Sequence, residues 1–269
     1  MTANLESPFS PEKIAEVHLP AAPLAGVMTQ IRFTSTARLQ TSNAAELVAN
    51  TFADDYPNFQ QATEQTWVLS AESATPSEST GTLWRLSSAD ERWQLTVAPN
   101  FITLLTQDYT SRDEFRSRLS ADWASLASAI RPSFVERVGF RYLNSVTDSQ
   151  ILGKIPSLIR PELIGGNALP KDSAAELVSS YNQVQLSFPE QGGLLARWGT
   201  MPANTVMDAS LPPIPVPSWI LDIDASSDMR LPVADFDADT VVDFLGDRAY
   251  KFFRWAVTPE FIAAFGGAE

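Results

Sequence analysis

Four strand-like segments follow one another between two predicted helices, and no helix separates them. Each is a short run of alternating apolar and polar residues bounded by turn residues, and together they occupy 66–70, 82–87, 92–98 and 101–107. Parallel neighbours need a crossover of a dozen or more residues, whereas antiparallel neighbours need only a short turn. The spacing therefore favours an antiparallel meander and argues against a doubly wound parallel sheet.

The two helices that flank these strands have recognisable boundaries. The first follows a strand at 26–33, begins at Asn43 with an acid in capping-box spacing, and ends before Tyr56-Pro57. The second begins at Ser111 with the same spacing and ends at Arg131-Pro132. Between those ends its apolar residues recur every three or four positions, which predicts an amphipathic helix with one buried face.

The second half of the chain shows the same order of short helix, strands and long helix. Strands are predicted at 183–188, 194–200 and 219–225, and a long helix is predicted at 239–255. We therefore predict an α+β fold of two antiparallel-sheet halves, each packed by a long amphipathic helix. The predicted domains are a lead-in at 1–22 and two α+β halves at 23–150 and 151–269, with the boundary in a segment rich in Pro and Gly.

Composition excludes several classes of function. The chain has no Cys and a single His, which excludes disulfide scaffolds, thiol nucleophiles and multi-histidine metal sites. Its net charge of −13 argues against a protein that coats nucleic acid. The N-terminal residues lack the basic and apolar regions of a signal peptide, and no apolar run approaches the roughly 20 residues of a membrane span. A cytoplasmic protein is predicted.

A strand at 134–144 carries the first candidate site. Alternation places Arg137 and Arg141 on one face, on either side of a glycine, and Arg32 of the first strand could join them. With Asn144 at the end of the strand, these residues are candidates for binding a phosphate or carboxylate. The simpler explanation is that the arginines pair with the protein's own carboxylates.

The second candidate is the acidic segment 208–247, which holds nine Asp and one basic residue. Asp222 and Asp224 share one face of a predicted strand and could hold Mg²⁺ or Ca²⁺; no other cofactor is predicted. The remaining acids could form a docking surface for a basic protein partner, or could cap the last helix and be solvated. The candidates for partner binding are Asp228, Asp235, Asp237, Asp239 and Asp243.

Several short motifs resemble an uncharacterised bacterial protein family of sporadic distribution. They are the Pro-rich entry to Gln30–Phe33 (QIRF), Tyr56-Pro57, the segment from Asp108 to Leu119, and above all Arg137–Asn144 (RVGFRYLN), with a similar Asp-containing strand at 221–224 and Phe-rich helix end at 253–260. This chain lacks the family's acid after the opening Pro-hydrophobic pair and the His in its last helix. The resemblance implies no established activity. Its patchy distribution is like that of phage-defence and toxin–antitoxin genes.

The sequence contains no nucleophile elbow, P-loop, dinucleotide-binding fingerprint or zinc-protease motif. His18 lies in the lead-in, where a surface or packing role is expected. We therefore predict a non-enzymatic binding or regulatory protein, of the antitoxin, immunity or phage-defence kind, that engages a basic protein partner. The alternative is an enzyme or sensor that binds an anionic small molecule or nucleotide through its arginines, with or without a divalent metal.

Overall fold

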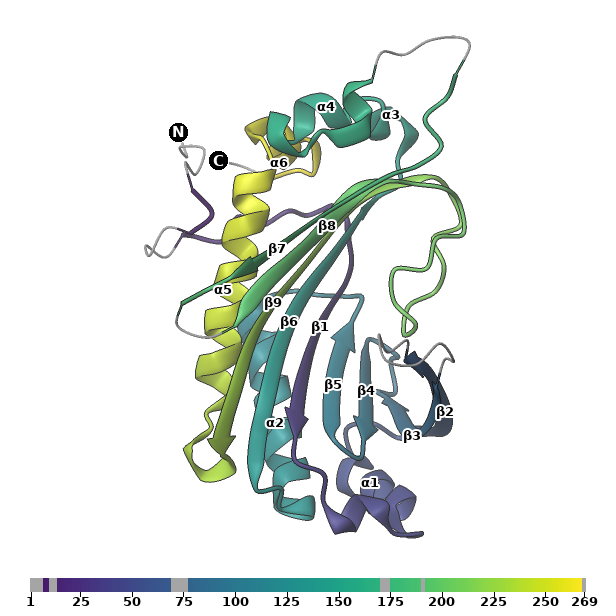
Figure 1. Ribbon diagram of the computed structural model, residues 1–269, viewed down its shortest axis with the longest axis vertical. Coiled ribbons are helices and arrows are strands. Elements are labelled where there is room, and N and C mark those ends of the chain that lie inside the picture. The colour runs from purple at the N-terminus through teal and green to yellow at the C-terminus, as the bar shows by residue number, and fades with distance from the viewer. Residues whose placement is uncertain (1–6, 10–13, 69–76, 170–174, 190–191, 268–269) are drawn as a thin grey trace. The chain divides into compact units, whose positions relative to one another are not determined.

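The computed structural model describes residues 7–9, 14–68, 77–169, 175–189 and 192–267 (Figure 1). The chain forms two compact units, and neither is one continuous stretch of sequence. Unit 1 contains residues 1–27, 139–227 and 243–269, and unit 2 contains residues 28–138 and 228–242.

Unit 2 holds the predicted meander. Its strands are β2 (Asn58–Val68), β3 (Ser77–Ser87), β4 (Trp93–Ala98) and β5 (Phe101–Thr106), and each pairs antiparallel with the next. Most of β1 (Leu24–Phe33) also belongs to this unit. The sequence also predicts a hairpin loop at 72–81; its residues 72–76 lie outside the described residues, whereas residues 77–81 belong to β3. Both β2 and β3 are therefore longer than their sequence patterns indicate.

Two helices accompany the meander, α1 (Ala44–Phe52) and α2 (Arg112–Ile130). The hydroxyl oxygen of Ser111 accepts a hydrogen bond from the Glu114 N–H, as a capping box requires, and Arg131 ends α2 in the left-handed conformation. The Asn43 side chain forms no such cap for α1, so that part of the prediction is wrong. The apolar face of α2 packs on unit 2 through ring contacts of Trp123 with Phe33 and of Phe115 with Trp93.

Unit 1 contains β7 (Ser180–Ser187), β8 (Gly193–Met201) and most of β6 (Phe134–Val146) and β9 (Ser218–Pro232). Along β9, residues Trp219, Leu221 and Ile223 are buried on one face, opposite the face that carries Asp222. Short helices follow β6, at α3 (Ser149–Leu152), α4 (Ile155–Leu158), η2 (Pro161–Leu163) and η3 (Gly165–Ala168), in the segment that the sequence indicates as irregular.

The long helix α5 (Ala238–Ala256) begins in unit 2 and continues into unit 1, and α6 (Pro259–Ala264) follows it. Thr258 followed by Pro259 is a sequence pattern that predicts a helix start, and the Thr258 hydroxyl accepts a hydrogen bond from the Phe261 N–H, which confirms it. In unit 1 the lead-in lies against the last two helices, because the Val17 N–H donates to the Tyr250 hydroxyl at 2.7 Å and the Ala21 N–H donates to the Phe265 carbonyl. His18 is exposed.

The nine strands form one antiparallel sheet in the order β2-β3-β4-β5-β1-β6-β9-β8-β7 (Figure 1). The α+β class is confirmed, but the prediction of two separate sheet halves is wrong. The reason lies in three long strands, since β1, β6 and β9 have 10, 13 and 15 residues and each continues from one unit into the other. Alternation in a sequence identifies a strand and its two faces, but it does not say which strand lies beside it.

Candidate functional site

An ion-pair network on β6, β8 and β9 is the first candidate site, and all of it lies in unit 1. Asp222 on β9 is the direct cross-strand neighbour of Arg197 on β8. Asp222 accepts hydrogen bonds from Nε and Nη2 of Arg141 at 2.7 and 2.9 Å, and from Nη1 of Arg197 at 2.9 Å. The Arg141–Asp222 pair is therefore bidentate, which is the strongest geometry for a guanidinium and a carboxylate.

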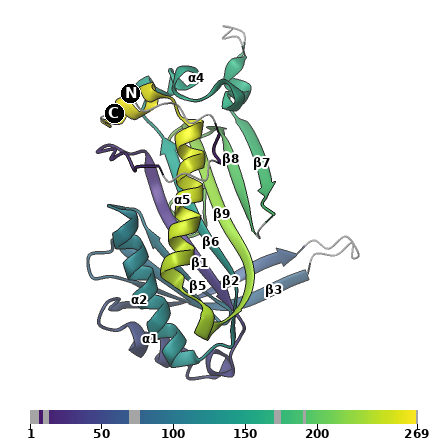
Figure 2. The same cartoon turned by 90° about the vertical axis from the view of Figure 1, so that its left-hand side faces the viewer.

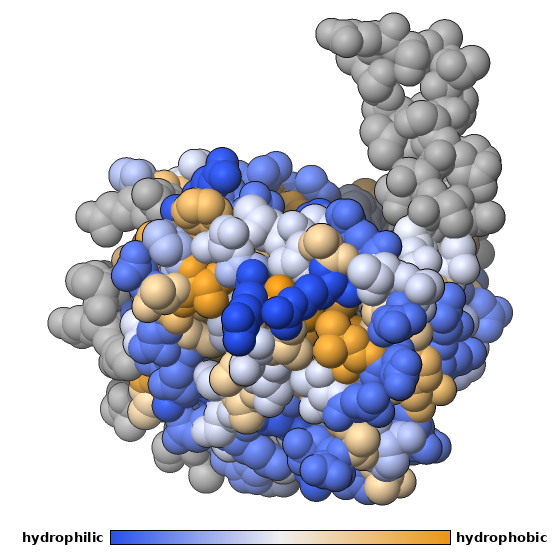
Figure 3. Space-filling model, turned by 90° about the horizontal axis from the view of Figure 1, so that it is seen from below, coloured by the Kyte–Doolittle hydropathy of each residue, from blue (hydrophilic) through white to orange (hydrophobic). Residues whose placement is uncertain are grey.

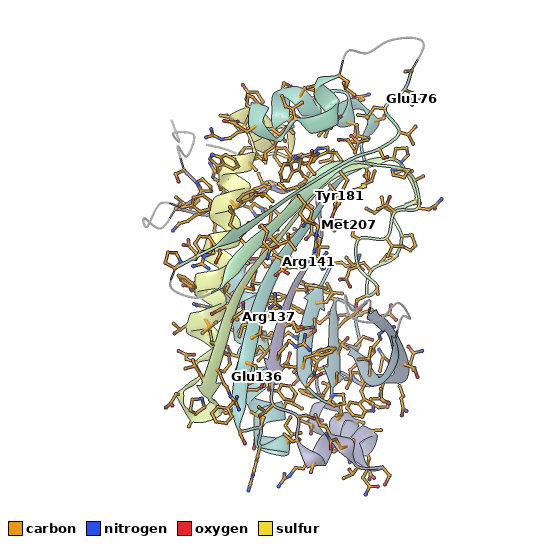
Figure 4. The ribbon with its side chains drawn as sticks, viewed as in Figure 1. Glu136, Arg137, Arg141, Glu176, Tyr181 and Met207 are labelled. Carbon is orange, nitrogen blue, oxygen red and sulfur yellow. The ribbon has the colours of Figure 1, made fainter. Side chains whose placement is uncertain are left out.

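The Pro-rich loop at 202–217 brings a second carboxylate to Arg141. This loop turns back on itself, because an isolated bridge joins Thr205 to Ile214. Near its tip, Asp208 accepts a hydrogen bond from Nη1 of Arg141 at 2.8 Å, and the Met207 carbonyl accepts one from Nη2 at 3.3 Å (Figure 4). Arg141, Arg197, Asp208 and Asp222 are called the Arg141 network below.

The Arg141 network is mostly hidden from solvent and balanced in charge. The side chains of Asp222 and Arg141 are 5% and 15% exposed, and those of Asp208 and Arg197 are 23% and 29% exposed. Burial alone would lower the pKa of the Arg141 guanidinium. Hydrogen bonding to Asp222 and the negative charges of Asp222, Asp208 and Asp224 outweigh that effect and hold the pKa above its ordinary value. Arg141 is therefore a permanent cation that is surrounded by its own carboxylates.

These contacts determine what the network can do chemically. The three guanidinium nitrogens of Arg141 already donate to protein oxygens, and both Asp222 oxygens already accept from arginines. Within the described ranges, no three His, Cys, Asp or Glu residues are grouped so that they could hold a metal ion. The arrangement fits a structural tie between the sheet and the 202–217 loop better than a ligand site.

The other residues predicted to bind an anion have separate surroundings. In unit 2, Nε of Arg137 lies 3.6 Å from an Asp228 oxygen, and Arg32 is exposed on β1. In unit 1, Nδ2 of Asn144 donates to the Leu221 carbonyl at 3.0 Å, and Asn144 is 5% exposed. Asn144 therefore ties β6 to β9 in the same part of unit 1 as the Arg141 network.

The acids predicted to bind a partner have mixed roles. Asp228 lies near Arg137 and Asp235 is exposed, whereas Asp243 is half-buried near the point where α5 enters unit 1. Asp237 caps α5, because it accepts hydrogen bonds from the Asp239 N–H at 3.0 Å and the Thr240 hydroxyl at 2.6 Å. The bond from Thr240 is the main cause that lowers the pKa of the Asp237 carboxyl. The capping explanation is therefore correct for this one residue.

Sequence reasoning missed a second buried cluster, which lies in unit 2 and comprises Tyr56, Arg118 and Asp122. The Tyr56 hydroxyl donates to Oδ2 of Asp122 at 2.6 Å and accepts from Nε of Arg118 at 2.9 Å. The Arg118 guanidinium lies 4.8 Å from the centre of the Tyr56 ring and 5.0 Å from that of Trp93. The sequence did indicate that Asp122 is buried, since it falls at helical spacing among the apolar residues of the predicted helix.

Burial changes the ionisation of this Tyr56 cluster. Tyr56 is 1% exposed and Asp122 is 4% exposed. Burial raises the pKa of the Asp122 carboxyl to about 7, against the lowering effects of the Tyr56 hydrogen bond and the Arg118 charge. Burial and the neighbouring Asp122 also raise the pKa of the Tyr56 hydroxyl. Perturbed groups of this kind occur both at functional sites and in structural networks, and this cluster has the close internal partners of a structural one.

Comparisons with known proteins assign no family to the chain, because no family model and no curated protein matches it. Among the helices of the described residues, none is long and apolar enough to cross a lipid bilayer. What the chain does must therefore follow from its own residues.

Proposed function

We propose that the chain is a non-enzymatic binding or regulatory protein that engages a basic protein partner through an acidic surface on unit 2. The observation that carries this proposal is a group of four carboxylates at the starts of α2 and α5, here called the acidic cluster. Its members are Asp113, Asp235, Asp237 and Asp239.

One arginine lies among these acids. Arg116 places Nη2 at 3.1 Å from an Asp113 oxygen and Nε at 3.1 Å from an Asp239 oxygen. The Asp113 and Asp239 side chains remain 86% and 47% exposed, and Asp235 and Asp237 are exposed as well. Four carboxylates and one guanidinium carry a net charge of −3, which favours approach of a basic surface. Figure 3 shows hydrophilic side chains over most of the face seen from below, with apolar ones between them.

The charged groups of unit 1 support a binding role over catalysis. The bonds of Arg141 and Asp222 are directed at one another and at protein oxygens, and no catalytic motif accompanies them. The resemblance to a bacterial family of patchy distribution adds the kind of partner that is proposed. An antitoxin, an immunity protein or a phage-defence factor acts by binding, and a basic effector that itself binds nucleic acid would complement this acidic chain.

The test is capture of a partner from source-cell lysate at about 50 mM and about 500 mM NaCl. The expected result is a basic protein that is bound at low salt and released at high salt. The variant Asp113→Asn/Asp235→Asn/Asp239→Asn should lose it, whereas a control with the same change in charge, Glu46→Gln/Glu162→Gln/Glu260→Gln, should keep it. These three glutamates are exposed and lie outside the acidic cluster. No captured protein at either salt, or equal capture by both variants, would count against the proposal.

A further inference from the structure

Strand β7 forms one edge of the sheet. It pairs with β8 on one side, and on its other side no strand of the described residues follows it (Figure 2). An edge strand presents a row of backbone N–H and C=O groups that can pair with another chain. The eight residues of β7 and their partner β8 all belong to unit 1.

The contacts with β8 show which backbone groups face outward. The Phe188 N–H donates to the Gly192 carbonyl at 3.1 Å, and the carbonyl oxygens of Ser180 and Leu186 lie against glycines of β8. Even-numbered residues of β7 therefore direct their backbone groups to β8. Because successive residues alternate, the backbone groups of the odd-numbered residues point away from the sheet. These residues are Tyr181, Gln183, Gln185 and Ser187.

This edge lacks the usual protection against pairing. Natural edge strands commonly carry charged side chains, proline or a bulge. The sequence of β7 is SYNQVQLS, which has no charged residue and no proline, and its register with β8 runs without interruption from Ser180 to Ser187. Two large apolar side chains beside or on this edge are also exposed, Val178 at 66% and Tyr181 at 55%.

We propose that β7 pairs antiparallel with β7 of a second copy of this chain, about a two-fold axis at Val184. In this register Gln183 lies opposite Gln185 of the second copy, and Tyr181 lies opposite Ser187. These are the outward-facing residues, so the two strands exchange about eight backbone hydrogen bonds. The four glutamines gather on one face, where each amide can donate to and accept from its neighbour.

The lack of charge on β7 favours a second copy of this chain as the partner that pairs with the edge. An uncharged edge offers no ion pair to a basic segment and none to an acidic one, whereas the two-fold register places amide opposite amide and no charge opposite a like charge. In a chain of net charge −13, an uncharged strip is where two copies can approach each other. A two-fold contact between identical surfaces is the commonest way in which soluble chains assemble.

Sedimentation of the full chain over a range of concentrations and salt tests the dimer. We expect dimers that become tighter with added salt, because salt screens the repulsion between two acidic chains. The same salt weakens a complex with a basic partner, so failure of this inference and failure of the proposed function are distinguishable. A chain that stays monomeric at every concentration and salt overturns the inference.

Charge variants at the two exposed glutamines test the register. Gln183→Glu/Gln185→Glu puts like charges opposite each other and should weaken the dimer at least tenfold. Gln183→Lys/Gln185→Lys should do the same although it makes the chain less acidic, whereas Gln183→Lys/Gln185→Glu should restore dimerisation. The control Gln60→Glu/Gln61→Glu changes exposed residues of the opposite edge strand β2 and should have no effect. A dimer that is lost only in this control would overturn the assignment to β7.

A single introduced cysteine tests the register of the β7 pair directly, because the chain has no cysteine of its own. Val184 faces itself across the proposed axis in a non-hydrogen-bonded pair, where Cα atoms are about 4.5 Å apart and within disulfide range. Val184→Cys should therefore be cross-linked by a copper–phenanthroline oxidant. Gln183→Cys faces residue 185 and should remain uncross-linked. The opposite pattern would contradict the register.

Discussion

Asp222 in unit 1 and Asp122 in unit 2 are equally hidden, since each residue is 4% exposed, yet their partners differ. Two guanidinium groups bond to Asp222, one of them through two nitrogens. The bonded partner of Asp122 is the Tyr56 hydroxyl, and Arg118 is reached through that hydroxyl. A buried carboxylate can keep its charge when cations bond to it directly, whereas a neutral partner leaves the cost of burial largely uncompensated.

The comparison separates two uses of a buried acid. The Arg141 network has two positive and two negative groups that hold the 202–217 loop against the sheet, and its cation is permanent. The Tyr56 cluster has one acid whose pKa lies near neutral pH because burial raises it to about 7. Removing a partner should therefore destabilise unit 1 at any pH near neutral, whereas the stability of unit 2 should depend on pH.

The largest effect is expected for Arg141→Met. This change removes the bidentate partner of Asp222 and the partner of Asp208, and it leaves a nearly buried carboxylate with Arg197 alone. Breaking a buried pair on one side typically costs 3–5 kcal/mol, so we expect a loss of about 5 kcal/mol in the free energy of unfolding. Urea denaturation at neutral pH measures it.

Arg197→Met is the matched control for this loss. The Arg197 side chain is 29% exposed, and Asp222 keeps both bonds to Arg141 when Arg197 is removed. The expected loss is about 1 kcal/mol, as for a partly exposed pair. Similar losses for the two variants would mean that Asp222 does not depend on the bidentate pair.

The second prediction concerns pH and Asp122. The pKa of this carboxyl is about 7 in the folded protein, whereas an ordinary aspartate has a pKa of 3.8, so the folded state holds the proton more tightly. The tighter binding of this proton stabilises the folded state below about pH 4, and this stabilisation is lost as pH rises to about 7. A difference of about three pKa units corresponds to about 4 kcal/mol.

Asp122→Asn removes this titration and keeps an acceptor for the Tyr56 hydroxyl. Relative to the original chain, the variant should therefore gain up to about 4 kcal/mol in the free energy of unfolding between pH 4 and pH 8. Denaturant titrations of both proteins at several pH values give the difference. Parallel curves for the two proteins would show that Asp122 is ionised throughout and that its burial is compensated.

The sequence predicts local features of this fold well, because they depend on neighbouring residues. The Ser111 cap, the Thr258 cap and the meander in unit 2 all follow from residues a few positions apart. The sheet order does not, because pairing of β6 with β9 joins residues far apart in the chain. Helical spacing in α5 indicates Val241 and Leu245 as buried residues. Leu245 is fully buried, whereas Val241 is half-buried and its neighbour Val242 is fully buried.

The candidate sites show the same limit. Alternation correctly separated Asp222 from the apolar face of its strand. The sequence also indicated that Arg141 could pair with the protein's own acids, as it does. The pattern did not say which acids these are, and the structure shows that they are Asp222 and Asp208. A carboxylate delivered by a long loop has no local pattern. Asp122 had one, because it interrupts the apolar stripe of α2.

Apart from the Arg197→Met control, the smallest effect is expected for Tyr56→Phe, which keeps the ring and removes only the hydroxyl. Oδ2 of Asp122 loses its donor and Nε of Arg118 loses its acceptor, so we expect a loss of about 2 kcal/mol at pH 5. The Tyr56 hydrogen bond lowers the pKa of Asp122, and its removal should therefore move the midpoint of the pH dependence above 7. In an Asp122→Asn background the same change should cost less, because coupled residues are not additive. An equal cost in both backgrounds would show that Tyr56 and Asp122 act independently and that the Tyr56 hydrogen bond has no part in setting the pKa of this acid.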